Sequence, residues 1–359
     1  MKKIGIFLGD VQGNGGIGRV TWIIANKLNA YYELHVLSAV RSRAKKYFYS
    51  EDVPIEYLFD SAGAVHSRFF KLTEGIRTFV YKNQLDVLIC AGAIYYPACV
   101  VAIRFSPVRL ICWEHSNVSV VNEHKFQRTC RRLGATFADY IVPLTRTDEH
   151  LYKQKYHVKN CRGIYNPVDD RLLGTVDYQT NSQKVISVGR LCYQKNFEEL
   201  VDVAHIFLEK NLAWTWDIFG EGENREAIQA KIDAYCLNDR LTLRGRVTDL
   251  YERYDQYSMI VMTSRFEGFP MTLLESTARG IPAVAYDVLT GPNEVIEEGK
   301  TGYLIQEGNI ESMAEKMQRL VDDAALRAKM SQCCVEKRNS FSCKNIIDEW
   351  RVVLDTVGS

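Results

Sequence analysis

The sequence lacks the marks of several large classes of protein. No segment repeats with a period of about 20–50 residues, and no tract is of low complexity. Hydrophobic residues make up 47% of the 359 positions and charged residues 25%, the proportions of an ordinary soluble globular chain. Collagen, coiled coil and disorder are therefore excluded. Because one hydrophobic core stops growing at roughly 250–300 residues, two domains are expected.

The ten cysteines include no C-x-x-C pair, and several, such as Cys90 and Cys112, stand inside apolar runs. Cysteine in such runs behaves as a small hydrophobic residue, so neither a disulfide framework nor a structural zinc site is expected. The basic start of the chain is followed by an apolar run too short for a signal peptide. Free thiols without export predict a cytoplasmic protein.

One uncharged stretch, residues 87–103, reaches the lower limit of about 17–25 residues for a membrane-spanning helix. Gly92 and Pro97 interrupt it. The pattern favours a buried strand over 87–90, a glycine turn and a helix over 97–104 instead of a membrane span.

The total charge is nearly balanced, with 45 Lys and Arg against 44 Asp and Glu, which argues against a nucleic-acid partner. The balance hides two opposed halves. Residues 1–166 hold 23 basic and 13 acidic residues, a net charge of +10, and the remainder holds 22 and 31, a net charge of −9.

Short apolar runs rich in β-branched residues alternate with amphipathic stretches, which predicts βα units and parallel sheets. Strands are expected over residues 3–8, 33–38, 55–59, 87–90, 109–112 and 140–142, and again over 184–188, 215–219, 241–243, 259–262, 283–286 and 302–305. Further helices are expected over 18–29, 67–83, 121–137, 146–155, 196–210, 224–236, 250–254, 271–279 and 310–322.

The turn-forming segment 165–170 separates the two sets of strands. We therefore expect an α/β protein of two domains, 1–166 and 167–344, with a C-terminal helix near 345–359 that belongs to the first. Parallel sheets bind ligands at the carboxyl ends of their strands, so a substrate is expected between two facing domains.

The glycine-rich segment 13–19 follows the first strand and opens a helix, so its backbone suits a phosphate. It contains G-x-G-x-x-G, but Glu33 begins the next strand instead of standing where a dinucleotide site needs its ribose-binding acid. A nicotinamide site is therefore weakly supported, and a glycine turn without a ligand is the other interpretation.

Arg190 and Lys195 stand between a strand and a helix, where two cations suit a diphosphate. Farther along, Glu267 lies in a loop and Glu275 lies inside the following helix, because Pro270 suits a first helical turn. The backbone N–H groups of Gly268, Phe269 and Met271 could bind an anion, and the carboxylates could bind sugar hydroxyls. A solvated charge pair and a glutamate that caps its own helix are the alternatives.

In chain order, these motifs resemble the retaining family 4 glycosyltransferases of GT-B fold, and the resemblance covers essentially the whole chain. The motifs are Gly-Gly-Ile-Gly-Arg (15–19), Trp-Glu-His-Ser-Asn (113–117), Ile-Tyr-Asn-Pro-Val-Asp (164–169), Val-Gly-Arg-Leu (188–191), Gln-Lys-Asn-Phe (194–197), Phe-Gly-Glu-Gly (219–222) and the pair Glu267 and Glu275. The resemblance implies two Rossmann-like domains whose parallel sheets face each other across a central cleft.

The same resemblance implies the roles of single residues. Arg190 and Lys195 would hold the diphosphate of a nucleotide sugar, Glu275 the ribose and Glu267 the donor sugar, while His115 would contact that sugar near the reacting carbon. The implied catalytic residues are His115, Glu267, Arg190 and Lys195, and the implied donor-binding residues are Gly15, Gly16, Arg190, Lys195, Gly220, Arg246, Val247, Glu267, Gly268, Phe269, Pro270, Met271 and Glu275.

The sequence has no D-x-D motif, which usually binds the metal and the diphosphate in the other major glycosyltransferase fold. The expected chemistry is therefore free of metal and cofactor: fixed cations and helix amides stabilise the departing diphosphate. The resemblance implies a same-face displacement with retention. A Gly-Pro-x-Glu stretch (291–294) looks like bacterial enzymes of surface polysaccharides, teichoic acids and lipid-linked oligosaccharides, which favours a UDP-hexose or UDP-N-acetylhexosamine donor.

Basic residues of the first half recur at helical spacing. The clusters are Arg41, Arg43, Lys45 and Lys46; Arg68, Lys71, Arg77 and Lys82; and Lys125, Arg128, Arg131 and Arg132. We expect attraction to an anionic membrane, hence a position on the inner face of the plasma membrane and a glycan acceptor on a polyprenyl diphosphate. A solvated basic face, or one that binds a phosphate-bearing polymer, is the alternative.

Two other classes of function stay open. One is an epimerase or a phosphorylase of the same architecture, although no pyridoxal-phosphate lysine motif is evident. The other is a non-catalytic protein that binds nucleotide sugars.

Overall fold

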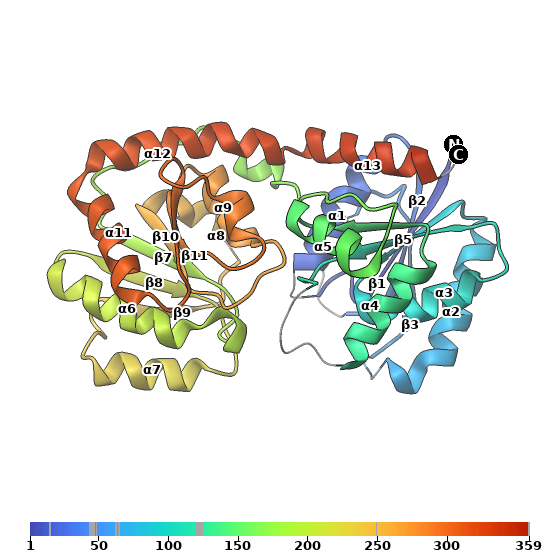
Figure 1. Ribbon diagram of the computed structural model, residues 1–359, viewed down its shortest axis with the longest axis horizontal. Helices are drawn as coiled ribbons and strands as arrows, with labels where there is room; N and C mark the ends of the chain where they lie inside the picture. Colours follow the sequence, from blue (N-terminus) through green and yellow to red (C-terminus); the bar gives the residue numbers. More distant parts are fainter. Residues whose placement is uncertain are drawn as a thin grey trace. The chain divides into compact units, whose positions relative to one another are not determined.

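The structure is a computed structural model that describes residues 1–13, 16–42, 47, 49–61, 63, 65–118, 125–248 and 250–357. The chain folds into two compact units, shown in Figure 1: Met1–Pro167 with Cys343–Ser359, and Val168–Ser342. Gly15, Arg43, Lys45 and Lys46 lie outside the described residues.

The first unit is built on a six-stranded parallel sheet of order β3-β2-β1-β4-β5-β6. Its register pairs Ile6 of the central strand with Val36 on one side and Ile89 on the other. The strands are β1 (Lys3–Leu8), β2 (Glu33–Val40), β3 (Ile55–Phe59), β4 (Val87–Ala91), β5 (Arg109–Glu114) and β6 (Tyr140–Pro143).

Helices cover this sheet and bury an apolar face against it. They are α1 (Gly16–Leu28), α2 (Phe69–Lys82), α3 (Tyr96–Ile103), α4 (Lys125–Phe137), α5 (Arg146–Tyr156) and α13 (Cys343–Val357). The C-terminal helix α13 packs against α1 and buries Ile346, Trp350 and Leu354, which recur every four residues and so share one helix face. The sequence-based expectation of this helix, and of its place on the first unit, is confirmed.

The second unit repeats the plan, with a six-stranded parallel sheet of order β12-β11-β10-β7-β8-β9. Its strands are β7 (Lys184–Val188), β8 (Thr215–Phe219), β9 (Leu241–Gly245), β10 (Met259–Met262), β11 (Ala283–Tyr286) and β12 (Gly302–Ile305). Its helices are α6 (Phe197–Lys210), α7 (Arg225–Ala234), α8 (Leu250–Arg253), α9 (Met271–Ala278), α10 (Pro292–Val295), α11 (Ile310–Asp322) and α12 (Ala324–Lys337).

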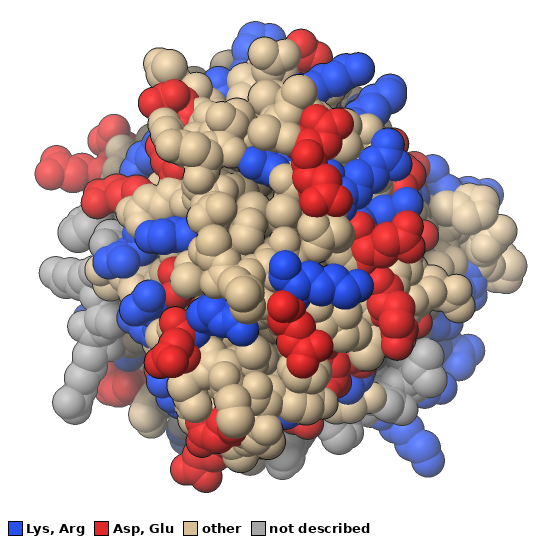
Figure 2. All heavy atoms as spheres, turned by 90° about the vertical axis from the view of Figure 1, so that its left-hand side faces the viewer, with Lys and Arg blue, Asp and Glu red and all other residues tan. Residues whose placement is uncertain are grey.

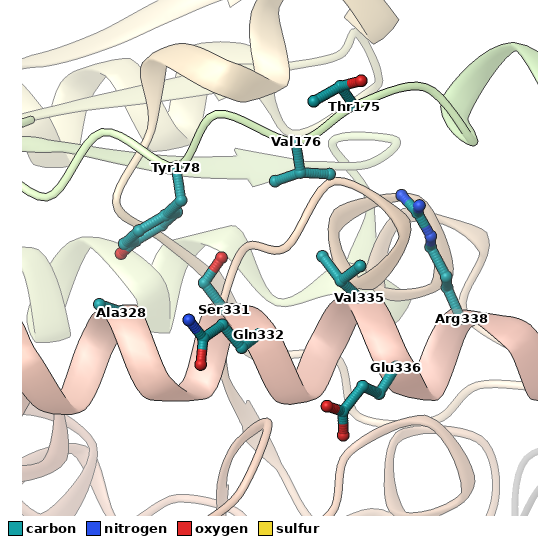
Figure 3. A pocket seen from close by; sticks show the side chains of 9 residues that line it. All are labelled: Thr175, Val176, Tyr178, Ala328, Ser331, Gln332, Val335, Glu336 and Arg338. Atoms are coloured by element: carbon teal, nitrogen blue, oxygen red, sulfur yellow. The ribbon is translucent and has the colours of Figure 1, made fainter.

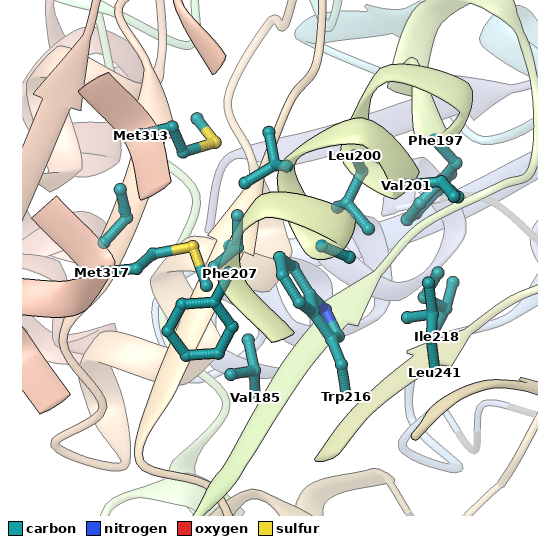
Figure 4. Packing of buried hydrophobic residues seen from close by; sticks show 14 of the residues in the cluster. Val185, Phe197, Leu200, Val201, Phe207, Trp216, Ile218, Leu241, Met313 and Met317 are labelled. Atoms are coloured by element: carbon teal, nitrogen blue, oxygen red, sulfur yellow. The ribbon is translucent and has the colours of Figure 1, made fainter. Parts of the chain in front are cut away.

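The core of the second unit joins β7 and β8 to α6 and α11. Figure 4 shows Trp216 of β8 and Phe207 of α6 packed beside Met313 and Met317 of α11. The indole Nε1 of Trp216 donates to the Ser187 hydroxyl at 3.0 Å, so the buried polar atom of this large ring is satisfied.

All twelve expected strands are present, and the α/β fold class is confirmed. Helices α10 and α12 were not expected from the sequence. The uncharged stretch 87–103 folds as β4, a 3-10 turn and α3, as the sequence favoured. Within the described residues, no helix has both the length and the apolar character that crossing a bilayer requires. All ten cysteines are free thiols.

Candidate functional site

The strand order reverses between β1 and β4 in the first unit and between β7 and β10 in the second. In parallel α/β sheets, ligands bind outside the carboxyl ends of the strands at this reversal. In the second unit, β7 leads into Gly189 and Arg190, and β10 leads into residues 263–270. The residues that the sequence singled out for a diphosphate and a sugar therefore follow two neighbouring strands.

Hydrogen bonds fasten these two loops to each other. The Arg265 amide donates to the Gln194 carbonyl at 2.8 Å, and the Gln194 side-chain amide donates to the Phe266 carbonyl at 2.9 Å. The Thr263 hydroxyl donates to the Asn196 carbonyl at 3.0 Å, where Asn196 takes a left-handed conformation just before α6. The backbone on both sides of Lys195 is thus fixed by the loop that carries Glu267.

Lys195 and Glu267, 72 residues apart in the chain, form an ion pair. The Nζ–Oε1 distance is 2.5 Å, and the two side chains are only 16% and 6% exposed. A charged pair this deep loses much of its hydration, and each partner is stable there only while the other, or a ligand, satisfies it. The ammonium can bind a phosphate oxygen and the carboxylate can accept from a sugar hydroxyl, so a ligand that offers both groups can replace the pair.

Arg190 is not part of this ion pair. Its side chain is exposed, and Nη2 lies 3.1 Å from Oε2 of the exposed Glu223. An exposed pair of this kind contributes little to stability, so the guanidinium is available to an incoming anion at small cost.

A glycine brings the end of β8 against the end of β7. Gly220 has a φ of +145°, and a Cβ added to it would lie 1.8 Å from the Gly189 carbonyl oxygen. Only glycine fits such an approach. The Gly220 amide also donates to the Gly245 carbonyl at 2.9 Å, so Arg246 and Val247, which follow Gly245, begin beside this turn.

Helix α9 begins directly after Pro270 and contains Glu275. Glu275 is buried, and its Oε2 accepts from the Tyr254 hydroxyl at 2.9 Å. The Phe269 ring is buried against Phe341, with ring centroids 5.8 Å apart. Within residues 268–271, the Phe269 side chain therefore supports the core of the unit.

In the first unit, His115 follows the carboxyl end of β5. Its ring lies on Trp113, with centroids 4.3 Å apart, and Trp113 in turn packs edge-on against Trp350 of α13 at 5.1 Å. Burial lowers the pKa of His115 to about 4, although the neighbouring Glu114 charge opposes this. His115 is therefore neutral near pH 7, and within the described part of the chain its buried Nε2 has no hydrogen-bond partner.

The residue before His115 belongs to a buried polar network that sequence reasoning missed. Glu114 Oε2 lies 2.8 Å from Nε of Arg131, and it also accepts from the Tyr152 hydroxyl at 2.8 Å. Burial alone would raise the pKa of Glu114, but Arg131 and the hydrogen bonds of Ser116 and Tyr152 hold it below its usual value. The network connects β5 with α4 and α5 beside the candidate histidine.

This network corrects the expected basic surface. Arg131 is 1% exposed and neutralises Glu114, so it is not one of the cations that α4 presents to solvent. The sequence could not separate it from Arg128 and Arg132, because its buried acidic partner stands 17 residues earlier in another element.

Gly16 is exposed and is the first residue of α1. Gly18, two residues into the helix, would bring a Cβ to 3.0 Å from the Val11 carbonyl oxygen, so the strand-to-helix turn here is tightly packed. Gly15, the other glycine expected to approach the donor, is among the residues that the structure does not describe.

A hollow of about 620 Å³ lies elsewhere on the second unit, between residues 175–178 and α12. Figure 3 shows its lining, which includes Tyr178, Ser331, Gln332 and Arg338 but none of the expected donor residues. Arg338 is used within the fold, because its Nη1 donates to the Ala278 carbonyl at 2.9 Å. We therefore place the candidate site at the strand ends.

Comparison with known proteins agrees with this architecture. The family model described as Glycosyltransferase Family 4 matches residues 14–172, and the model described as Glycosyl transferases group 1 matches residues 176–333. The chain is a GT-B glycosyltransferase.

Two curated relatives match this glycosyltransferase over nearly its full length. The amylovoran biosynthesis glycosyltransferase AmsD of Erwinia amylovora is 27% identical over 99% of this chain and 100% of its own. A Campylobacter jejuni α-1,4-N-acetyl-D-galactosaminyltransferase, named as acting on a diNAcBac-PP-undecaprenol-linked GalNAc disaccharide, is 24% identical over 98% of this chain and 97% of its own.

Among solved structures, a mutant of Staphylococcus aureus TarM in complex with fondaparinux, α-GlcNAc-glycerol and UDP superposes with a TM-score of 0.83. The match covers 99% of this glycosyltransferase and 100% of that chain, at 15% identity. It shows the fold that the sequence motifs predicted.

Proposed function

We propose that this glycosyltransferase moves a hexose or N-acetylhexosamine from a UDP-sugar to a lipid-linked glycan of the bacterial surface, with retention and without a metal. The buried Lys195–Glu267 pair carries this proposal. It joins a cation suited to a phosphate and a carboxylate suited to sugar hydroxyls at the strand reversal of the second unit. The UDP bound in the TarM structure supports the choice of nucleotide.

Binding of the donor replaces the internal ion pair. The diphosphate takes the ammonium of Lys195 and the guanidinium of Arg190, which gives up its exposed contact with Glu223. Glu267, released from Lys195, accepts hydrogen bonds from the sugar. Gly220 and the turn at Arg246 and Val247 bind the nucleoside, and Glu275 binds the ribose.

Transfer then depends on charge at the leaving group. As the bond from the anomeric carbon to the diphosphate oxygen breaks, negative charge gathers on the diphosphate and positive charge on the sugar ring. Arg190, Lys195 and the backbone N–H groups of Gly268, Phe269 and Met271 stabilise that diphosphate. This stabilisation is worth more in a desolvated site than in water. A diphosphate oxygen takes the proton of the attacking acceptor hydroxyl, and attack on the same face retains the configuration.

His115 contributes from the first unit as a neutral group. With its pKa lowered to about 4, the imidazole neither repels the positive ring of the transition state nor competes with Arg190 and Lys195 for phosphate charge. It can donate or accept one hydrogen bond to a hydroxyl of the donor sugar.

The acceptor is proposed from two observations. AmsD is named for a polysaccharide, and the Campylobacter enzyme is named for an undecaprenyl-diphosphate-linked glycan. Exposed cations on α2 and α4 favour an anionic surface, and each basic residue near such a membrane contributes about 1 kcal/mol. Both fit an enzyme that works at the inner face of the plasma membrane.

The donor is tested first, by thermal unfolding with a panel of UDP-, GDP- and ADP-sugars. A donor present at about 100 times its dissociation constant stabilises the fold by about 2.7 kcal/mol. We expect UDP-hexoses or UDP-N-acetylhexosamines to raise the unfolding temperature, with and without EDTA. Stabilisation by GDP- or ADP-sugars alone contradicts the proposed nucleotide.

The reaction is tested with the stabilising donor and lipid extracts. Formation of an α-linked product from an α-linked donor, read from the anomeric proton coupling, supports retention. Conversion of the nucleotide sugar without acceptor indicates an epimerase, and release of a sugar phosphate that depends on inorganic phosphate indicates a phosphorylase. Donor binding with no turnover on any acceptor indicates a binding protein.

A further inference from the structure

Helices α2, α3 and α4 lie side by side on the first unit, with α3 in contact with both of the others (Figure 1). Their sequences contain basic residues but a single acid, Glu74. Mutual packing of the helices leaves one outer face to solvent.

That outer face carries large apolar side chains. Phe105, just after α3, is 92% exposed, and Phe70 at the start of α2 is 86% exposed. On α4, Phe126, Leu133 and Phe137 are exposed at intervals of seven and four residues, so they form one stripe along the helix. Single exposed hydrophobic residues are ordinary, but a stripe with neighbours on adjacent helices marks an interaction surface.

Cations and rings meet where the three helices come together. The Arg104 guanidinium lies 5.9 Å from the ring centroids of both Phe105 and Phe137, which ties the end of α3 to the end of α4. Arg77 of α2 donates from Nη2 to the Val101 carbonyl at 3.0 Å. These contacts join cations and rings of all three helices, and we refer to the exposed cations and rings of these helices as the patch.

Most of the exposed basic side chains on these helices are not paired with acidic side chains of the described residues. Within the described residues, no ion pair includes any of these exposed basic side chains: Lys71, Arg77, Arg104, Lys125, Arg128 and Arg132. Lys82, by contrast, pairs with Glu56 at 2.9 Å and is not part of the patch.

We infer that this patch inserts into an anionic phospholipid bilayer, with Phe105, Phe126, Leu133 and Phe137 at the acyl boundary and the arginines at the phosphates. Apolar side chains rimmed by Lys and Arg are the composition of surfaces that lie in a membrane interface. A soluble polyanion would match the cations, but it offers no apolar phase for Phe105 and Phe70. The purpose of this insertion, which is to capture a lipid-linked acceptor, rests on the proposed function.

The test uses the full chain and sedimentation with vesicles of phosphatidylglycerol and phosphatidylcholine, compared with phosphatidylcholine alone. We expect binding to the anionic vesicles and at least about tenfold weaker binding to the neutral ones. The variant Arg128→Gln/Arg132→Gln removes two cations, and at roughly fivefold for each it loses up to about 30-fold in affinity at low salt. Lys329→Gln/Lys344→Gln, two exposed lysines on α12 and α13, is the matched control and keeps wild-type binding.

Insertion is separated from simple charge attraction by a second pair of variants. Phe105→Ser/Phe137→Ser should lose the binding that persists at high salt, while Leu212→Ser, which removes an exposed side chain of the second unit, should not. In a parallel measurement, Phe105→Trp should gain fluorescence that brominated phosphatidylglycerol quenches, whereas Leu212→Trp should not. Circular dichroism confirms that each variant is folded.

Equal vesicle binding by wild type and the folded Phe105→Ser/Phe137→Ser variant, together with unquenched Phe105→Trp, overturns the inference. Binding to soluble polyphosphate as tight as to vesicles, and unaffected by the phenylalanine changes, assigns the patch to a polymer instead. None of these measurements contains a sugar donor. Failure to bind UDP-sugars would therefore refute the proposed function and leave the vesicle result standing.

Discussion

The two units of the chain have the same strand order when each is numbered from its own first strand, β3-β2-β1-β4-β5-β6 and β9-β8-β7-β10-β11-β12. At the strand ends the first unit presents a neutral histidine on a tryptophan, and the second presents a buried ion pair. One topology therefore supports two different sites, since the sheet fixes where a site lies and the loops fix its chemistry.

Their surfaces differ as well. In Figure 2, the face of the second unit carries Lys and Arg interspersed with Asp and Glu. Ion pairs of this unit include Lys231–Asp202 and Arg225–Glu221. Helices α2 to α4 of the first unit instead present cations beside exposed rings. Residues 343–359 carry a net charge of −1 and belong to the first unit, so the +10 and −9 of the two sequence halves become +9 and −8 for the two units. The two units therefore differ both in net charge and in how their charged side chains are arranged.

The largest effect is expected from a substitution that disrupts the charged site of the second unit. Lys195→Ala removes the cation proposed to stabilise the diphosphate, so transfer should fall by about 10³ or more. The matched control is Lys231→Ala, which removes a partly buried lysine paired with Asp202 on the same unit and should leave turnover unchanged. Initial rates with the identified donor, and thermal unfolding of both variants, provide the comparison. Turnover near the wild-type rate in folded Lys195→Ala refutes its role.

The next prediction concerns the buried pair of the first unit. Arg131→Met leaves the Glu114 carboxylate without its cation, and the free energy of unfolding should fall by about 3–5 kcal/mol. Arg109→Met breaks the more exposed pair with Asp139 on the same sheet and should cost less than about 1 kcal/mol. Urea unfolding measures both. Equal losses would mean that burial does not distinguish the two pairs.

A third prediction tests whether the histidine of the first unit is neutral. The folded-state pKa of His115, about 4, lies below its usual 6.5. Between pH 4 and pH 6.5, the His115 ring is therefore protonated in the unfolded chain but not in the folded chain. The free energy of unfolding falls as the pH drops from 6.5 to 4, by at most about 3 kcal/mol. His115→Gln should lack this loss. His150→Gln, at an exposed histidine of α5, is the control and should follow the wild type.

The smallest effect is expected from a substitution beside the charged site of the second unit. Glu223 pairs with Arg190 and, in the proposed site, would compete with the donor diphosphate for it. Glu223→Gln removes that competition, and because both side chains are exposed, donor affinity should rise by no more than about threefold. Isothermal titration with the identified donor measures the change. Weaker binding in the variant would show that Glu223 assists the donor.

Most of the fold could be predicted from the sequence, because strands of parallel sheets are buried on both faces and form short apolar runs. Helix α12 escaped prediction because its buried face is partly polar. Arg327, 4% exposed, points inward and donates to the Val321 carbonyl at 3.0 Å and the Thr180 carbonyl at 2.6 Å. Apolar periodicity cannot reveal a helix whose buried residues include an arginine.

For the candidate site, the sequence indicated residue types at strand ends but not their partners. Arg190 and Lys195 looked equivalent as cations before a helix, yet one is exposed and the other is buried against Glu267. Arg131 looked like its exposed neighbours on α4 and is buried against Glu114. Spacing along one helix defines a face, but whether that face meets an acid depends on which strand lies beneath it.

What the sequence by itself determined is therefore local. Alternating apolar and amphipathic segments set the strands and helices, and glycines such as Gly220 set turns that no other residue could form. The tertiary structure alone decided which charges are neutralised. Lys195 and Glu267 stand 72 residues apart and meet because β7 and β10 are neighbours at the point where the strand order reverses. Such pairing depends on sheet order, which results from the packing of the whole unit and is encoded in neither segment alone.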